Sequence, residues 1–444
     1  MKLPNLLATK AGRLTAFFAL YMTEGIPLGF TATAITFQMR NEGVGPAAIG
    51  AFVASLYLPW TFKFLAGPFV DVLSSDRWGR RRMWIIGTQL LMVGALMAAL
   101  PVNFSTELRL FTILIFIHNV FCATQDVAID ALACNVLEEK ERGLANGLMF
   151  AGANVGQAIG GSCVLYLLAW FSFPTTYYFV AGTILAVTVF VAVPMREPKG
   201  PPRPPSDDDP FTRAAKEVFT FIVAAFRAVF LNRAACLGLA FALLPAGAYG
   251  LGLALQSTLA VELGMNSTQV ANLNIVTTLV NAGGCVLGGW MSDRFGRRRM
   301  LALFVTSMSI PTLYLAMVMY RHHWIMPIDP NLVDRPVPAP ALVAAFWATS
   351  IAYAVFNGLM YGTRSALFMD ITTPAVAATQ FTAYMALLNT VISYSAAWQG
   401  FAVERWGYPT TLAIDGVAGV VGLVLLPLMK PRPKPAPASA GAEG

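Results

Sequence analysis

Charge and histidine are scarce in this sequence. Only 12% of its 444 residues are Asp, Glu, Lys or Arg, and three are histidine, whereas 57% are hydrophobic. The mean hydropathy of +0.62 is too high for a soluble globular protein. The five cysteines form no C-x-x-C pair, and the sequence has no P-loop, nucleophile elbow or H-E-x-x-H. We therefore expect a membrane protein that is not an enzyme and holds neither a metal nor an organic cofactor.

The sequence contains many long apolar runs. A transmembrane helix needs about 20 mostly apolar residues, because each residue rises about 1.5 Å through a layer of about 30 Å. The runs are continuous rather than alternating, which favours helices over barrel strands. They predict an all-α membrane protein with twelve transmembrane helices, near residues 13–38, 47–71, 83–102, 108–134, 144–170, 175–195, 234–261, 268–291, 300–320, 341–369, 376–402 and 408–429.

The net charge is +7, but the basic residues lie mainly in the loops between apolar runs, so the charge does not indicate nucleic-acid binding. If the loops alternate between the two sides, 23 of the 30 Lys and Arg residues lie on the side of both termini. The positive-inside rule therefore predicts that both termini are cytoplasmic. Only Lys63 and Arg364 are cations within the spans.

An internal repeat indicates two related halves. GRRRM occurs at Gly79–Met83 and again at Gly296–Met300, 296 − 79 = 217 residues apart. Pro27 and Pro245, each among glycines, are 245 − 27 = 218 residues apart. Interrupted helices at matching positions of two halves indicate the central site of a transporter.

The repeat and the composition together predict four segments. Residues 1–195 and 234–430 form two six-helix bundles, and residues 196–233 form a cytoplasmic linker that carries PKGPPRPPSDDDP. Its proline-rich part cannot hold a helix, whereas Thr212 to Phe230 could form an amphipathic helix on the membrane surface. Residues 431–444 are rich in Pro and Ala and are predicted to be disordered.

The segment GWMSDRFGRR, from Gly289 to Arg298, has the form G-x-x-x-D-R-x-G-R-R. It resembles the loop signature of the major facilitator superfamily, and the first half carries the same signature with an insertion. The resemblance implies the facilitator fold and a charged latch between conformations. The matching residues are Gly67, Asp71, Asp76, Arg77, Gly79, Arg80 and Arg81 in the first half, and Gly289, Asp293, Arg294, Gly296, Arg297 and Arg298 in the second.

Two longer segments carry a closer resemblance. They are FKFLAGPFVDVLSSDRWGRRRMW, from Phe62 to Trp84, and CATQDVAIDALACNVLEEKERGLANG, from Cys122 to Gly147. They are similar to the branch of the superfamily that contains anhydromuropeptide permeases and acetyl-coenzyme A transporters. This resemblance implies a multi-pass protein of the bacterial inner membrane. It also implies import of peptidoglycan fragments, driven by protons as the coupling ion.

Three acidic residues within the spans are candidates for proton coupling, because an ionisable group in the bilayer costs roughly 2.5–3.5 kcal/mol on insertion scales. Asp126 and Asp130 are four residues apart and share one helical face, and Glu24 precedes the Gly-Ile-Pro of the first span. Three interpretations of the Asp pair remain: proton coupling, an ion pair with Lys63 or Arg142, and the lining of a wet vestibule. Glu24 could carry the proton instead, or could satisfy broken-helix backbone or pair with Lys63.

The two cations within the spans are candidates for holding an anionic part of the substrate, or else for bridging helices. The amides on helix five suit sugar hydroxyls, and tyrosines could stack on a sugar ring. Gln157 also stands where the helix-five signature of proton antiporters has proline, which ranks drug export lower. The predicted substrate-binding residues are Lys63, Gln125, Asn154, Gln157, Arg364, Tyr249 and Tyr361.

The sequence therefore predicts a monomeric, proton-coupled secondary transporter that works by alternating access in the lipid bilayer. Its expected partner is a small, amphipathic or anionic molecule, most specifically an anhydromuropeptide. The alternatives are import of a siderophore or another amphipathic anion, and drug/proton antiport.

Overall fold

The computed structural model describes residues 5–73, 78–137, 142–198, 208–230, 233–371 and 377–429, and these residues contain helices and no strand. The all-α prediction is confirmed. The main helices are α1 (Lys10–Gly29), α2 (Thr36–Asn41), α3 (Pro46–Thr61), α4 (Ala66–Val72), α5 (Arg80–Ala99), α6 (Leu108–Val136), α7 (Arg142–Ala158), α8 (Val164–Leu167), α9 (Phe173–Val187), α10 (Pro210–Phe230), α11 (Arg233–Ala242), α12 (Ala254–Glu262), α13 (Ser267–Phe295), α14 (Arg297–Arg321), α15 (Pro340–Ile371) and α16 (Ala377–Val421).

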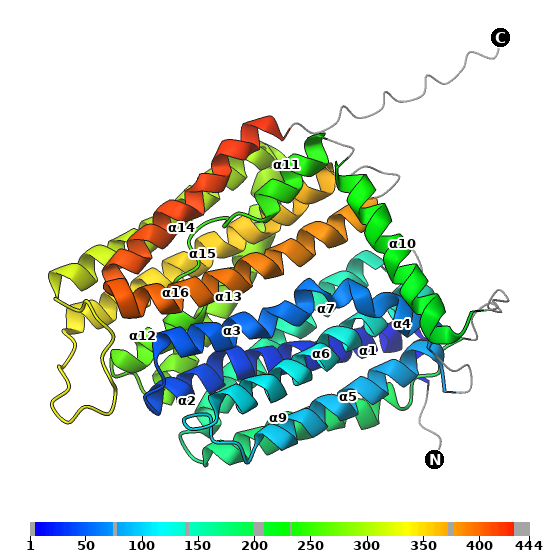
Figure 1. Ribbon diagram of the computed structural model, residues 1–444, viewed down its shortest axis with the longest axis horizontal. Coiled ribbons are helices and arrows are strands. Elements are labelled where there is room, and N and C mark those ends of the chain that lie inside the picture. Colours follow the sequence, from blue (N-terminus) through cyan, green and yellow to red (C-terminus); the bar gives the residue numbers. More distant parts are fainter. Residues whose placement is uncertain are drawn as a thin grey trace, which may run out of the picture.

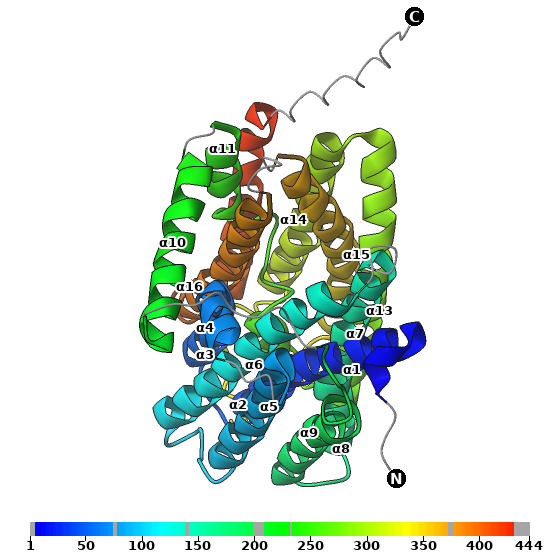
Figure 2. The ribbon, with the colours of Figure 1, turned by 90° about the vertical axis from the view of Figure 1, so that its right-hand side faces the viewer.

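The helices form two groups that lie side by side (Figure 1). Helices α1 to α9 form the N half, and α11 to α16 form the C half. Helix α10 crosses from one half to the other at one end of the bundle, and it packs against α4, α11 and α16. Viewed onto that end, α10 runs along one edge of the bundle (Figure 2). We call this end the linker end and the opposite one the far end.

Nine helical stretches within the described ranges are long and apolar enough to span a membrane. The last of them, Ala383–Leu428, covers most of the final two predicted spans, which are divided at Gly407 by a positive φ of 80°. The predicted span 234–261 is broken, because residues 243–253 separate α11 from α12 and neither helix reaches 18 residues. The count of twelve spans stays a prediction.

The two prolines at matching positions do not act alike. Pro245 lies in the break between α11 and α12, as expected. Pro27 does not interrupt the first helix, which continues through a π-helical segment, Phe30–Ile35, into α2. Proline lacks the N–H that an α-helix needs, and a π-helical turn shifts the hydrogen-bond register locally. The expected break is therefore only a local bulge in the N half.

Glycines let α1 and α7 pack with their backbones close together. A Cβ atom at Gly156 would lie 2.5 Å from the Met22 carbonyl oxygen. A Cβ atom at Gly160 would lie 1.8 Å from the Ile26 carbonyl oxygen. From the other helix, a Cβ at Gly25 would lie 2.0 Å from the Ala153 carbonyl oxygen. Small residues at such spacing allow close helix approach in membranes.

Replacing Gly160 with Ala is expected to destabilise the N half, because the Ile26 carbonyl is backbone and cannot move aside. Overpacking of this kind costs about 1–3 kcal/mol. We expect a lower melting temperature of the purified protein in detergent, measured by tryptophan fluorescence. Gly87→Ala in α5 is the matched control, since a Cβ there meets nothing within 4 Å. Equal melting temperatures for the two variants would contradict the packing argument.

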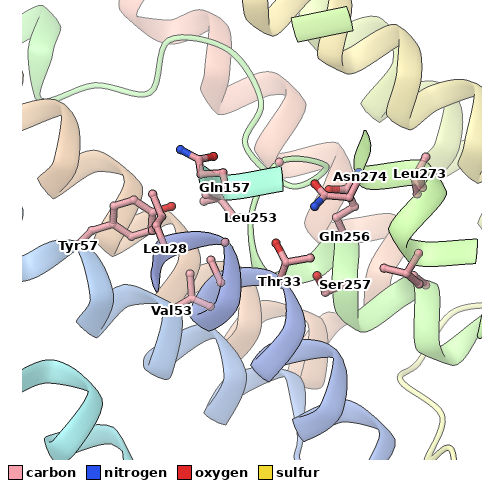
Figure 3. Close-up of a pocket in the computed structure, with 15 residues that line it drawn as sticks. Leu28, Thr33, Val53, Tyr57, Gln157, Leu253, Gln256, Ser257, Leu273 and Asn274 are labelled. Atoms are coloured by element: carbon pink, nitrogen blue, oxygen red, sulfur yellow. The ribbon is translucent and has the colours of Figure 1, made fainter. Parts of the chain in front are cut away.

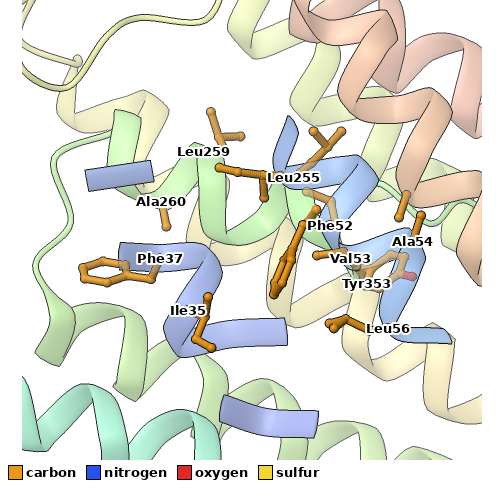
Figure 4. Close-up of a cluster of buried hydrophobic side chains, with 14 of the residues drawn as sticks. Ile35, Phe37, Phe52, Val53, Ala54, Leu56, Leu255, Leu259, Ala260 and Tyr353 are labelled. Carbon is orange, nitrogen blue, oxygen red and sulfur yellow. The ribbon is translucent and has the colours of Figure 1, made fainter. Parts of the chain in front are cut away.

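Side chains from both halves form one buried hydrophobic cluster (Figure 4). Ile35 and Phe52 of the N half are 0% and 1% exposed, and Leu255 and Leu259 of α12 are each 2% exposed. Helix α3 packs along α16, where the Ser393 hydroxyl donates to the Ala54 carbonyl oxygen at 2.8 Å. This cluster joins the two halves next to the cavity described below.

Candidate functional site

Four ionisable side chains meet inside the N half. Lys63 lies in a short turn where α3 has ended, and Asp126 and Asp130 come from α6. The Lys63 ammonium lies 2.5 Å from the Asp126 carboxylate, and the Tyr21 hydroxyl donates to Asp130 at 2.5 Å. Of the open interpretations, the ion pair between Lys63 and Asp126 is present. It is not an alternative to proton coupling, because a paired carboxylate can still exchange its partner for a proton.

Glu24 of α1 completes this acidic cluster. Its carboxyl group lies near the Asp126 carboxyl group, and its Oε2 atom is buried without a hydrogen-bond partner. Neighbouring carboxylates repel each other when both are ionised. The cluster thus brings all three predicted proton carriers around one lysine ammonium.

Buried polar side chains next to the cluster are joined to one another by hydrogen bonds. The amides of Gln89 and Gln125 both donate to the Thr23 hydroxyl, at 3.2 and 2.9 Å, and the Thr188 hydroxyl donates to Gln89 at 2.8 Å. Gln125 is 0% exposed. The structure therefore places this predicted substrate ligand in the wall between helices rather than in the cavity.

Arg364 of α15 is a buried cation in the C half and is 1% exposed. It donates to the Tyr249 hydroxyl at 3.2 Å, and its guanidinium lies over the Tyr361 ring at 5.0 Å. Its Nε atom is buried without a partner, and no ion pair joins Arg364 to a carboxylate in the described part of the chain. A buried guanidinium with aromatic neighbours and no acid is suited to bind an anionic group.

Asp415 of α16 holds the break between α11 and α12 in place. Its Oδ2 atom accepts the backbone N–H groups of Tyr249 and Gly250 at 2.8 and 2.7 Å, and its Oδ1 atom accepts the Gln399 amide at 2.7 Å. The side chain is 3% exposed. Asp415 thus fixes the backbone of the break and positions Tyr249 beside Arg364.

Asp415→Leu is expected to destabilise the C half strongly, while Asp415→Asn is expected to be mild. Leucine removes the acceptor of two buried N–H groups, which costs about 1–3 kcal/mol for each. Asparagine keeps one oxygen for them, and the Gln399 amide can turn its unpartnered Oε1 towards the new NH₂ group. Melting temperatures in detergent measure both effects. A stable Asp415→Asn protein that has lost gradient-driven transport would instead make Asp415 a proton carrier.

A cavity of about 150 Å³ lies between the two halves (Figure 3). Its N-half wall comes from α1, the π-helical segment after it, α3 and α7, and its C-half wall from the helix break, α12 and α13. Gln157 is the one predicted substrate ligand that lines it, and Asn154 donates instead to the Phe150 carbonyl at 2.9 Å. The lining polar side chains are Thr33, Tyr57, Gln157, Gln256, Ser257 and Asn274.

The repeated loop signature has the same backbone conformation in both halves. Gly79 has φ 86° and ψ 125°, and Gly296 has φ 92° and ψ 123°. Each glycine directly precedes an arginine-rich helix, α5 or α14. A positive φ of this size favours glycine, so both glycines of GRRRM have a backbone role. The two halves therefore turn alike between their second and third helices.

The second-half signature forms an ion-pair network at the linker end. Arg297 pairs with Asp293 at 3.0 Å and with Asp370 of α15 at 2.7 Å. Arg294 lies over the Trp290 ring, 6.0 Å from its centroid, and Arg298 donates to the Pro427 carbonyl at 3.5 Å. These contacts lie within the C half. Whether they act as a latch between conformations stays a prediction.

The first-half signature is described only in part. A Cβ at Gly67 would meet nothing within 4 Å, and the Arg81 backbone N–H donates to Glu197 at 2.8 Å. Arg80 and Arg81 make further interactions. Asp76 and Arg77, and the side chain of Asp71, lie outside the described residues.

A buried ion pair at the far end was missed by the sequence analysis. Arg40, at the end of α2, donates to Glu262, at the end of α12, at 2.7 and 3.0 Å, and the side chains are 4% and 0% exposed. Tyr408 donates to the same carboxylate at 2.6 Å. The sequence did hold a signal for this pair, because Arg40 and Glu262 carry opposite charges directly after the first and seventh predicted spans. This pair links the two halves directly.

Comparison with known proteins identifies the family. The family model described as Major Facilitator Superfamily matches residues 14–247 and residues 237–444. The anhydromuropeptide permease of Escherichia coli strain K12 is 25% identical over 420 residues, which cover 93% of this chain and 79% of that protein.

Solved structures agree at the level of the fold. The nucleoside transporter NupG superposes with a TM-score of 0.69 at 14% identity, covering 94% of this chain and 98% of that one. A D-xylose-proton symporter gives a TM-score of 0.67 at 14% identity, with 93% and 96% covered. The chain is a multi-pass protein of the bacterial inner membrane, and it belongs to the major facilitator superfamily of transporters.

Proposed function

We propose that this secondary transporter couples proton entry to the import of anhydromuropeptides, the recycled fragments of peptidoglycan. The single observation that carries the proton part is the cluster of Glu24, Asp126 and Asp130 around one lysine. With every group ionised, three carboxylates and one ammonium leave a net charge of −2 inside the membrane. Binding of protons removes that charge at little cost, whereas leaving it in the bilayer is expensive.

Arg364 supports an anionic substrate. Its guanidinium has phenol neighbours and, within the described ranges, no carboxylate partner. A carboxylate of the substrate would supply the missing counter-charge and a partner for Nε. Peptide stems carry such carboxylates. The permease from E. coli, 25% identical over most of this chain, is named for anhydromuropeptides.

The proposed mechanism is alternating access between the two halves. The acidic cluster lies in the N half, Arg364 lies in the C half, and the cavity lies between them. Protonation of Glu24, Asp126 or Asp130 neutralises the cluster and allows the loaded transporter to turn inward. The protein needs only protons as the coupling ion, works as a monomer in the bilayer, and uses no organic cofactor.

Two other transport functions remain as alternatives. A siderophore or another amphipathic anion would use Arg364 in the same way, and only the identity of the substrate would change. Drug/proton antiport would use the acidic cluster with the opposite substrate direction. The amide residue Gln157 stands at the position of the antiporter proline and lines the cavity, which disfavours that alternative (Figure 3).

The test is uptake of labelled N-acetylglucosaminyl-anhydro-N-acetylmuramyl peptide into proteoliposomes, with and without an inward proton gradient. We expect saturable uptake that the gradient stimulates and that a protonophore abolishes. Absence of uptake by correctly folded protein would reject this substrate and favour siderophores or drugs. Stimulation by a sodium gradient in place of the proton gradient would reject proton coupling.

A further inference from the structure

The cavity between the halves presents hydrogen-bonding groups without charge. The amides of Gln157 and Gln256 and the hydroxyls of Thr33 and Tyr57 line it, and within the described residues these side chains make no hydrogen bond to the protein. Asn274 uses its NH₂ group on the Ser162 hydroxyl at 3.0 Å, which leaves its amide oxygen available. In Figure 3, the side chains of Gln256 and Asn274 lie close together, and Gln157 lies apart from them on the N-half wall.

We propose that this cavity binds the neutral end of the substrate, a group rich in hydroxyls and amides, while Arg364 holds the anionic end. The inference rests on the proposed function and assigns the orientation of the substrate and the residues that select its neutral end. Free amides can donate and accept at once, so they match hydroxyl and acetamido groups better than carboxylates. A charged group in this cavity would find no counter-ion among its lining residues.

The two subsites adjoin at the break between α11 and α12. Tyr249, which accepts the Arg364 hydrogen bond, is joined to the cavity residue Gly252 by a backbone hydrogen bond of 3.0 Å. On the other wall, Tyr57 of the cavity lies near Tyr361, whose ring lies under Arg364. One extended molecule can therefore touch both subsites.

The position of each subsite along its helix sets the orientation. Arg364 lies in the last turns of α15, which ends at the linker end, whereas Asn274 lies in the first turns of α13, which begins at the far end. The anionic end of the substrate thus points towards the linker end. The neutral end points towards the far end, where α12 and α3 close the cavity.

The volume of the cavity limits what the neutral end can be. A cavity of about 150 Å³ is far smaller than a whole muropeptide, so in this conformation it admits only one end of the substrate. The remainder of the substrate must extend towards Arg364.

The experiment measures binding of two small probes to the full chain in nanodiscs by saturation-transfer NMR. N,N′-diacetylchitobiose, called chitobiose below, is a neutral disaccharide whose terminal N-acetylglucosamine ring probes the cavity, and N-acetyl-Ala-Ala probes Arg364. We expect Gln256→Leu and Asn274→Leu each to weaken chitobiose binding about tenfold, the usual effect of one lost hydrogen bond, and to leave the dipeptide unaffected. Arg364→Gln is expected to weaken the dipeptide and leave chitobiose unaffected.

Gln38→Leu in α2 is the matched control, because it removes the same amide as Gln256→Leu at a side chain that does not line the cavity and donates to Glu42 instead. It should change neither affinity. The inference is overturned if chitobiose does not bind, or if the cavity variants leave its affinity unchanged. It is also overturned if Arg364→Gln weakens both probes equally. Muropeptide uptake without chitobiose binding would leave the proposed function standing, whereas the expected binding pattern without muropeptide uptake would reject only that substrate.

Discussion

Replacing Asp126 with Asn is expected to abolish proton-driven uptake while the protein still reaches the membrane. The Asp126 carboxylate is 2.5 Å from the Lys63 ammonium and lies near the Glu24 carboxyl group. An amide can neither take up a proton nor balance the lysine charge. The ratio of uptake with a proton gradient to uptake without one should therefore fall to 1, while substrate exchange in the absence of a gradient persists. Undiminished gradient-driven uptake would remove Asp126 from the mechanism.

A double variant separates a proton carrier from a structural partner. Removing one member of a buried ion pair costs about 3–5 kcal/mol, and the cost is lower here because the Lys63 side chain is 28% exposed. Lys63→Gln combined with Asp126→Asn removes both charges and should recover the melting temperature of the wild type. If it stays uncoupled, Asp126 carries the proton. If it regains gradient-driven uptake, Asp126 served only to balance Lys63.

Glu24→Gln and Asp130→Asn identify the carrier within the acidic cluster. If the replaced carboxyl group is the one that binds the proton in exchange for the lysine, the variant should lose proton coupling. If the replaced group only alters the electrostatic potential at the carrier, the variant should keep proton coupling and show a changed pH dependence of uptake. Tyr21→Phe is the control for Asp130, because it removes the hydrogen bond of 2.5 Å and leaves the carboxyl group. Gradient-driven uptake at several pH values measures all three.

Most of the helices could be predicted from the sequence because a membrane restricts which segments can span it. Because a spanning helix must satisfy its own backbone and remain apolar for about 20 residues, runs such as 83–102 and 300–320 identify the α5 and α14 helices within a few residues. The two interrupted helices were less predictable. Proline at position 27 or 245 has the same local chemistry, and only packing decides between a π-helical bulge and a break of eleven residues, 243–253.

The candidate site was predictable in its residue types and not in its pairings. Glu24, Lys63, Asp126 and Arg364 stood out because charge within a span is costly. Sequence spacing could not show that Lys63 contacts Asp126, 63 residues away, or that Gln125 faces the interior of the N half rather than the cavity. Helical periodicity gives the face of a residue, and the neighbour of that face is set by tertiary packing.

The ion pair between Arg40 and Glu262 escaped notice for a different physical reason. Both residues lie at the ends of their helices, where a charge normally reaches water and needs no partner. In the structure, the neighbouring loops bury them: Arg40 also donates to the carbonyl oxygens of Val44 and Ile328, at 3.1 and 2.6 Å. The Ile328 N–H donates to Glu262 at 3.1 Å. Burial, which the sequence does not report, turns an ordinary surface charge into a contact between the halves.

Glu262→Gln is expected to open the far end of the transporter. It leaves the Arg40 guanidinium buried without a carboxylate in the described part of the chain, at a cost of about 3–5 kcal/mol. The cost falls only on the conformation in which the far end is closed, so the population should shift by about two orders of magnitude or more towards the open one. The readout is labelling of Ser257→Cys in the cavity by a membrane-impermeant maleimide added from the predicted outer side, in a background that lacks the exposed Cys134 and Cys163.

Two paired variants test whether the unpaired charge is the cause. Arg40→Met combined with Glu262→Leu removes both charges, and such replacements of buried pairs are often neutral or stabilising, so labelling should return to the level of Ser257→Cys alone. Arg40→Glu combined with Glu262→Arg should not rescue, because it places a carboxylate among the Val44 and Ile328 carbonyl oxygens and a guanidinium against the Tyr408 hydroxyl and the Ile328 N–H. Wild-type labelling in Glu262→Gln would show that the hydrophobic cluster between α3 and α12 closes the far end by itself. Full rescue by the charge swap would show that the net charge matters there and the surrounding hydrogen bonds do not.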